Sequence, residues 1–224
     1  INDIGPLSSL TNLTRLGLYD EETRDYSYYD WSWEYDFIAN SDLYINDISD
    51  IKPLSGLKKL TSLSLSGINI DDLSTVFEMT ELTELDIYCG DADISAIAGL
   101  KKLETLTLKS VFLRGEELDI SVLSELKALS SLYLWGVDIK NITPICGLEN
   151  LKEITLEDTG VHDLGPLTGL SALESLSYKN NRVMTRDISL SSITALQGLT
   201  ELVLENVNIT DLSRVSEFSS LTRL

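Results

Sequence analysis

The hydrophobic positions of this chain recur in a six-residue box, Leu-x-x-Leu-x-Leu, in which Ile or Tyr also occupies the later positions. Most steps from one box to the next are 21 or 22 residues, two are 26 and one is 47. Self-similarity at a fixed period of this size is typical of a solenoid. Eight complete boxes begin, in chain order, at Leu13, Leu60, Leu82, Leu103, Leu129, Leu151, Leu173 and Leu199, and a ninth starts at Leu221.

Each box predicts a short strand, because alternation sends the leucines to one face and the x residues to the other. Two more apolar residues lie three and six positions before each box, as Leu57 and Leu54 do. A return segment this short fits a 3₁₀ turn or extended chain rather than a long helix. An Asp precedes most returns and is placed to cap the turn by accepting backbone N–H bonds; these residues are Asp3, Asp50, Asp72, Asp93, Asp119, Asp163 and Asp211.

One coil cannot bury its leucines alone, so the coils must stack and share one continuous core. The best match to a known pattern is residues 45–63, Ile-Asn-Asp-Ile-Ser-Asp-Ile-Lys-Pro-Leu-Ser-Gly-Leu-Lys-Lys-Leu-Thr-Ser-Leu. This segment resembles the internalin-like leucine-rich repeats of bacterial surface proteins. The resemblance implies an α/β leucine-rich-repeat solenoid, a right-handed arc with a parallel sheet on its concave face and short 3₁₀ or extended returns on its convex face. It also implies an extracellular or cell-surface adhesion module that grips another protein with the concave face.

The chain departs from the family at one position. The family has Asn three residues after the last strand leucine, where stacked side chains form a hydrogen-bonded ladder. In this sequence Asn181 keeps that residue type, whereas Val137 and Val207 occupy the same position in two other coils. We expect aliphatic packing to replace the ladder there.

We expect residues 1–224 to form a single domain. Both ends fall inside a repeat and no polar cap is visible, which predicts a piece of a larger protein. The three longer repeats each gain their extra residues just after the strand, the largest at about 19–47. The insertions are therefore expected along one edge of the arc, a placement that often marks the binding side.

The large insertion is rich in aromatic and acidic residues. Tyr and Trp supply large contact areas at low entropic cost. The aromatics could therefore bind a partner, or they could pack onto the solenoid and hold the insertion in place. A calcium site among the acids is a further alternative, although no EF-hand spacing occurs. The candidate binding residues here are Tyr28, Tyr29, Trp31, Trp33 and Tyr35.

The x positions of the boxes give the residues of the concave face directly. Aromatic residues at outward positions do not pack in the core and therefore suggest a binding partner, although strand propensity alone also favours them. The candidate partner-binding residues on this face are Tyr88, Lys109, Tyr133, Trp135, Glu157 and Lys179.

The net charge of −19 argues against nucleic acid and anionic membrane surfaces as partners, and no apolar stretch is long enough to cross a membrane. The chain has one histidine, His162, and two distant cysteines, Cys89 and Cys146, so we expect no metal site, no cofactor and no catalysis. The favoured function is protein recognition by a bacterial surface or secreted protein. A structural spacer and carbohydrate binding by the insertion remain open alternatives.

Overall fold

The computed structural model describes residues 3–19, 48–66, 70, 72–89, 93–110, 117–139, 141–181, 187–209 and 212–224. Within them, eight strands form one open parallel sheet whose order follows the chain, β1-β2-β3-β4-β5-β6-β7-β9. Each complete box supplies one strand, as predicted, and the ninth copy contributes a single bridge between Glu201 and Arg223. The strands are β1 Arg15–Tyr19, β2 Ser62–Ser66, β3 Glu84–Tyr88, β4 Thr105–Lys109, β5 Ser131–Trp135, β6 Glu153–Glu157, β7 Ser175–Lys179 and β9 Glu201–Glu205.

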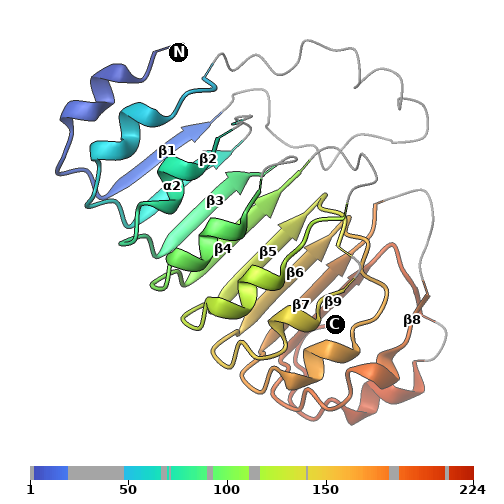
Figure 1. Ribbon diagram of the computed structural model, residues 1–224. Coiled ribbons are helices and arrows are strands. Elements are labelled where there is room, and N and C mark those ends of the chain that lie inside the picture. The colour runs from blue at the N-terminus through green and yellow to red at the C-terminus, as the bar shows by residue number, and fades with distance from the viewer. Residues whose placement is uncertain are drawn as a thin grey trace, which may run out of the picture.

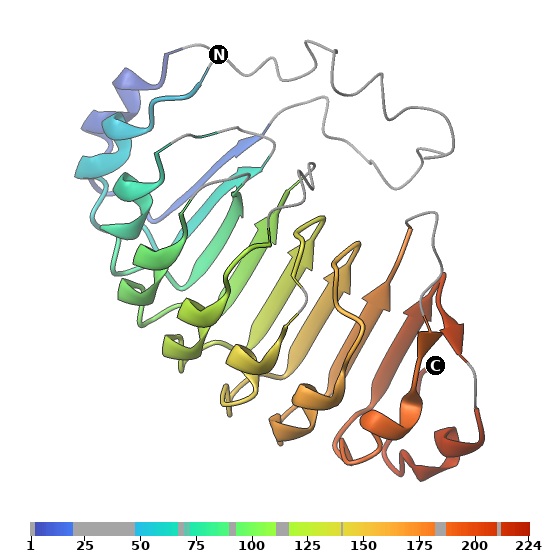
Figure 2. The same cartoon turned by 45° about the vertical axis from the view of Figure 1, so that its right-hand side comes forward.

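The returns lie opposite the sheet and are 3₁₀ turns in nearly every described coil. Figures 1 and 2 show the strands side by side along an arc, with the turns following one another along its other side. The third coil differs, because its return is a single α-helical turn, α2 Ser74–Phe77. The 3₁₀ turns are η1 Gly5–Ser9, η4 Lys52–Gly56, η5 Ser95–Gly99, η6 Ser121–Glu125, η7 Thr143–Ile145, η8 Gly165–Gly169, η9 Leu190–Ser192 and η10 Ser213–Glu217.

The predicted Asp caps are present at the start of these turns. In six described coils an Asp side chain accepts the backbone N–H two residues later, and Asn141 does the same in a seventh. The remaining predicted cap, Asp211, lies outside the described residues. The N···Oδ1 distances run from 2.7 Å at Asp3 to 2.9 Å at Asp50. Each cap satisfies a backbone donor that the short turn leaves without a partner. The sequence analysis therefore identified both the residue type and its role.

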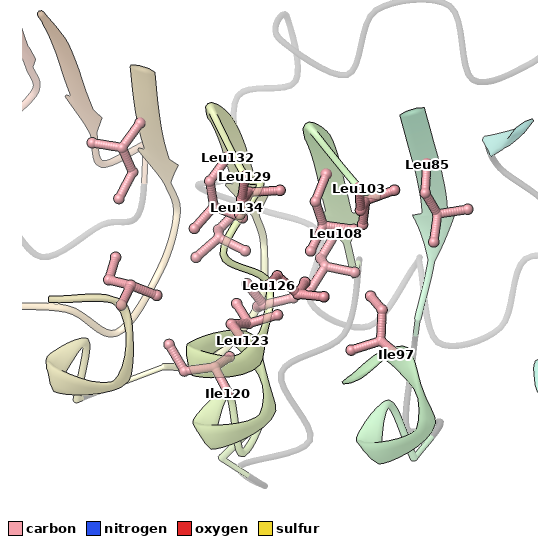
Figure 3. Packing of buried hydrophobic residues seen from close by; sticks show 14 of the residues in the cluster. Leu85, Ile97, Leu103, Leu108, Ile120, Leu123, Leu126, Leu129, Leu132 and Leu134 are labelled. Atoms are coloured by element: carbon pink, nitrogen blue, oxygen red, sulfur yellow. The ribbon is translucent and has the colours of Figure 1, made fainter. Parts of the chain in front are cut away.

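The core lies between the sheet and the turns. Leu129, Leu132 and Leu134 approach from the sheet side and meet Leu123 and Leu126 from the η6 side (Figure 3), and each is at most 1% exposed. The same inward positions are buried in coil after coil. Among the described residues, the large exposed hydrophobics all lie in the first and last coils of the structure; they are Leu10, Leu212 and Leu224.

The chain turns away from the sheet through a left-handed residue in three coils. Gly136 has φ +68°, and Asp158 and Asn206 both have φ +53°, a region that favours Gly, Asn and Asp. Their coils have no insertion at this point, whereas the two 26-residue repeats carry Ser110 and Asn180 at the equivalent position. Near the last coils a second, two-stranded parallel sheet pairs β8 Asp187–Ile188 with β10 Asn208–Ile209.

The turn caps predict a pH dependence of stability. The hydroxyl and backbone N–H of Ser74 hold the pKa of Asp72 below its usual 3.8, and the backbone N–H and hydroxyl of Ser121 lower the pKa of Asp119 in the same way. A group whose pKa is lower in the folded state contributes stability above its ordinary pKa and loses it as pH falls through the lowered value. Asp72→Asn with Asp119→Asn keeps both acceptors but removes their titration.

In the double variant, the urea midpoint should therefore fall less than in the parent chain between about pH 5 and about pH 2.5. A matched pair, Glu149→Gln with Glu174→Gln, removes two carboxylates that cap no turn, and its midpoint should follow that of the parent. Parallel loss of stability in the parent and the cap variant would contradict the role of the caps.

Gly136→Ala should destabilise the solenoid strongly. A Cβ at this position would lie 1.9 Å from the backbone oxygen of Ser110 in the preceding coil. The left-handed backbone alone costs an alanine about 1–2 kcal/mol, and the contact with a backbone atom adds to that cost. The matched control is Gly147→Ala, whose Cβ would meet only the flexible end of Lys127, 3.7 Å away. Urea unfolding should show a large loss for the first variant and a change within about 0.5 kcal/mol for the second; equal losses would refute the assignment.

Candidate functional site

The outward residues of the sheet form three columns that follow the arc. The register places like positions of neighbouring strands side by side, as predicted: Tyr133 pairs with Thr107 and Thr155, and Trp135 pairs with Lys109 and Glu157. The inward residues of the same strands belong to the core. The outward face is therefore a regular array whose side chains are not needed for the packing of the leucine core.

Basic residues of this array already pair with acids on a strand one or two places along the sheet. The Lys109 ammonium lies 3.1 Å from an oxygen of Asp86, and the Ser64 hydroxyl donates to the other oxygen at 3.0 Å. Arg15 lies 3.2 Å from Glu84. Two of the candidate binding residues, Lys109 and Lys179, thus pair within the chain, the second with Glu205 at 3.6 Å.

Two aromatic residues share the middle strand of the face. Tyr133 and Trp135 are both partly exposed on β5. The Tyr133 hydroxyl donates a hydrogen bond of 3.0 Å to Glu157 on β6. Burial, and then the negative charge of Glu157, raise the pKa of Tyr133 well above its ordinary value. The phenol therefore stays protonated at physiological pH and remains a donor.

Glu157 is held in place by neutral donors. Besides Tyr133, the side-chain amide of Asn181 donates to its second oxygen at 3.3 Å. Asn181 also accepts a bond from the Asn206 amide and receives support from Asp158, whose carboxylate accepts the Asn181 backbone N–H. Sequence reasoning missed Asn181 as part of the face, although it was the one position that kept the residue type of the family ladder.

Tyr88 does not belong to the exposed face. It occupies an outward position, but only 8% of it is exposed. Its register neighbour Lys109 on β4 forms an ion pair with Asp86, which lies two residues before Tyr88 on β3. The expectation that Tyr88 is available to a partner is therefore wrong, because alternation along a strand predicts direction and not exposure.

The expectation of aliphatic packing at the strand exits is confirmed at Val137, which is 2% exposed, and at Val207, which is partly buried against the core. Thr159, at the same position in another coil, is polar and buried. Ser110, Asp158 and Asn180 are buried one residue earlier. The exits thus combine aliphatic and polar contacts, and the sequence did not reveal the polar share, because burial at a turn depends on the neighbouring coil.

The aromatic insertion falls outside the described residues, and so do Tyr28, Tyr29, Trp31, Trp33 and Tyr35. The strand after which the insertion leaves the sheet is among the described residues. The longer repeats leave the sheet after β1, β4 and β7, and the strands are parallel, so their carboxyl ends lie on one edge of the sheet. That part of the prediction is confirmed.

No protein-family model and no curated protein matches the sequence. Solved structures do match. Internalin C2 from Listeria monocytogenes is 31% identical, with 78% of this chain and 75% of that chain covered and a TM-score of 0.62. The chain belongs to the internalin-like family of leucine-rich-repeat proteins.

Two further structures share the fold with this internalin-like chain. The internalin inlF from Listeria monocytogenes has 21% identity, coverage of 99% of this chain and 63% of that one, and a TM-score of 0.62. The plant peptide hormone receptor RGFR1, solved in complex with RGF2, has 18% identity, coverage of 76% and 32%, and a TM-score of 0.53. At these identities the likeness concerns the fold alone.

The described part of the internalin-like chain offers little for metal or thiol chemistry. No group of three or more His, Cys, Asp or Glu side chains there is arranged to hold a metal ion. Cys89 is buried, Cys146 is partly buried, and the two do not form a disulfide with each other. His162 is exposed, as expected. None of the described helices has the length and apolar character needed to cross a membrane.

Tyr133→Phe should weaken the polar network of the face without disturbing the core. Loss of a hydrogen bond to a charged group costs about 1–3 kcal/mol of unfolding free energy. The test is a double-mutant cycle with Glu157→Gln, measured by urea unfolding. The cost of removing the hydroxyl should be smaller once Glu157 has lost its charge. Strictly additive effects would show that the two groups do not interact.

Proposed function

We propose that this chain is a non-catalytic protein-recognition module of a bacterial cell-surface or secreted protein. It binds a protein partner through its concave face, with the aromatic insertion as a second contact. The observation that carries the proposal is the pair Tyr133 and Trp135, which stand partly exposed in the middle of an array that the core does not need. Large aromatic side chains dominate the binding energy of protein interfaces.

The family relationship supports this proposal. Internalin C2 and inlF come from a bacterium, and the plant receptor RGFR1 shows that the same fold receives a peptide ligand in at least one protein. The insertion adds support from its position, since it leaves the sheet at the edge next to the outermost column, where Trp135 lies. A partner on the face could therefore contact both regions.

The test is a binding screen against extracellular proteins and glycans with the parent chain and three variants. Trp135→Ala should weaken binding of a true partner about tenfold or more, because truncation of a hot-spot aromatic costs about 2 kcal/mol of binding free energy. Deletion of residues 21–43 reports on the insertion. Thr107→Ala is the matched control, since Thr107 is a register neighbour of Tyr133 on the same face and its side chain is small.

Circular dichroism must first show that all four proteins are folded. A protein ligand lost on Trp135→Ala and retained on Thr107→Ala supports the proposal. A glycan that depends on the insertion while Trp135 is dispensable would replace it with carbohydrate binding. Ligands that tolerate both Trp135→Ala and the deletion, or no ligand at all, would reject it and leave the spacer as the better explanation.

A further inference from the structure

The two halves of the concave face differ in charge balance. On β1 to β4 the outward acids are Glu84 and Asp86, and each forms an ion pair within the chain, with Arg15 and Lys109. A partner that approached this half would have to break those pairs. On strands β1 to β4, therefore, both outward acids already have a cationic partner within the chain.

The other half carries an excess of acid. The outward positions of β5, β6, β7 and β9 hold four carboxylates and one lysine. Lys179 pairs with Glu205 at 3.6 Å, and Arg223 pairs with Glu201 at 2.7 Å. The two remaining acids both lie on β6, and among the described residues neither forms an ion pair; they are Glu153 and Glu157.

These two glutamates are oriented without being neutralised. Glu157 accepts bonds from the Tyr133 hydroxyl and the Asn181 amide, and Glu153 lies 3.4 Å from the hydroxyl of Ser131. All three donors are uncharged groups. A carboxylate already held by its neighbours binds an incoming cation with less loss of freedom.

The surroundings of β6 suit an extended segment. Thr155 lies between the two glutamates. On β7 the register neighbours of Glu153 and Thr155 are small, Ser175 and Ser177, and that of Glu157 is Lys179, which is paired with Glu205. On the other side Trp135 stands directly beside Glu157, where its ring can also take a cation. The glutamates are four positions apart on the strand, a span of about 13 Å at about 3.3 Å per residue.

We propose that the partner presents an extended basic segment, in which two Arg or Lys side chains four residues apart bind Glu153 and Glu157, with Trp135 against the second. This proposal rests on the proposed function and gives the partner its chemistry. A segment aligned with β6 places side chains four apart on the same side at the same spacing of about 13 Å. A nucleic acid or an anionic membrane would meet repulsion at the same place.

The probe is a nine-residue Ser/Thr peptide with arginine at its third and seventh positions. It is titrated to millimolar concentration into the isotope-labelled chain at low salt and followed by NMR through the Trp135 indole N–H and the β6 amides. Two controls have the same length: one carries arginine at the third and fourth positions, and the other carries glutamate in place of both arginines. We expect saturable shifts with the first peptide, binding several-fold weaker with the second, and none with the third.

The matched variants remove equal charge from different places. Glu153→Gln with Glu157→Gln should weaken binding of the peptide about fivefold to tenfold, because the variant loses two solvent-accessible ion pairs with it. Glu125→Gln with Glu174→Gln alters two glutamates that pair with lysines outside the sheet columns, and it should change binding less than twofold. Equal losses in both variants, indifference to arginine spacing, or no shift at millimolar peptide would overturn the proposal.

Failure of this inference can be told apart from failure of the proposed function. A protein partner that depends on Trp135 but tolerates Glu153→Gln with Glu157→Gln would keep the recognition module and reject the basic segment. A screen in which nothing depends on the concave face would reject the recognition module itself.

Discussion

The structure depends on one constraint: the leucines of a coil can be buried only by the coils on either side of it. Every coil must therefore offer the same apolar positions to its neighbours, which is why Leu106, Leu132 and Ile154 lie side by side in the register and are at most 1% exposed. Because this requirement uses only the inward side of each strand, the outward side is free to vary. The regularity of the core and the variety of the concave face thus have the same origin.

The same constraint decides where the chain can change length. The parallel ladder continues one residue past the strands, since Ser110 N–H donates to the carbonyl of Trp135, and Asp158 N–H donates to that of Lys179. Residues before this point cannot be added without shifting the leucines out of register. Residues after it can be added freely, and the two 26-residue repeats gain theirs just beyond Ser110 and Asn180. Three repeats without extra residues turn there through a left-handed residue instead, as Gly136 does.

The acidic residues that the structure describes serve different purposes, set by where they lie in the coil. At the turns, carboxylates such as Asp119 accept backbone N–H groups and cap the returns. At the loops that lead into the strands, glutamates pair with lysines of a neighbouring coil, as Glu81 does with Lys102. On the concave face they are either paired, as Asp86 is, or left available, as Glu153 is. The net charge of −19 is therefore no guide to function until the residues are sorted in this way.

The sequence by itself determined the coils, the strands, the caps and the outward columns, because all of them follow from a repeated spacing that each coil obeys locally. It also placed the insertions at the carboxyl ends of the strands. Only the tertiary structure decided what the outward residues do. Tyr88 is buried and Lys109 is paired because residues of adjacent coils meet across the register, and Asn181 joins Glu157 through contacts between coils whose side-chain geometry no spacing rule specifies. A periodic pattern fixes the direction of each side chain, whereas its exposure and its partners depend on neighbours that lie some 20 residues away in the sequence.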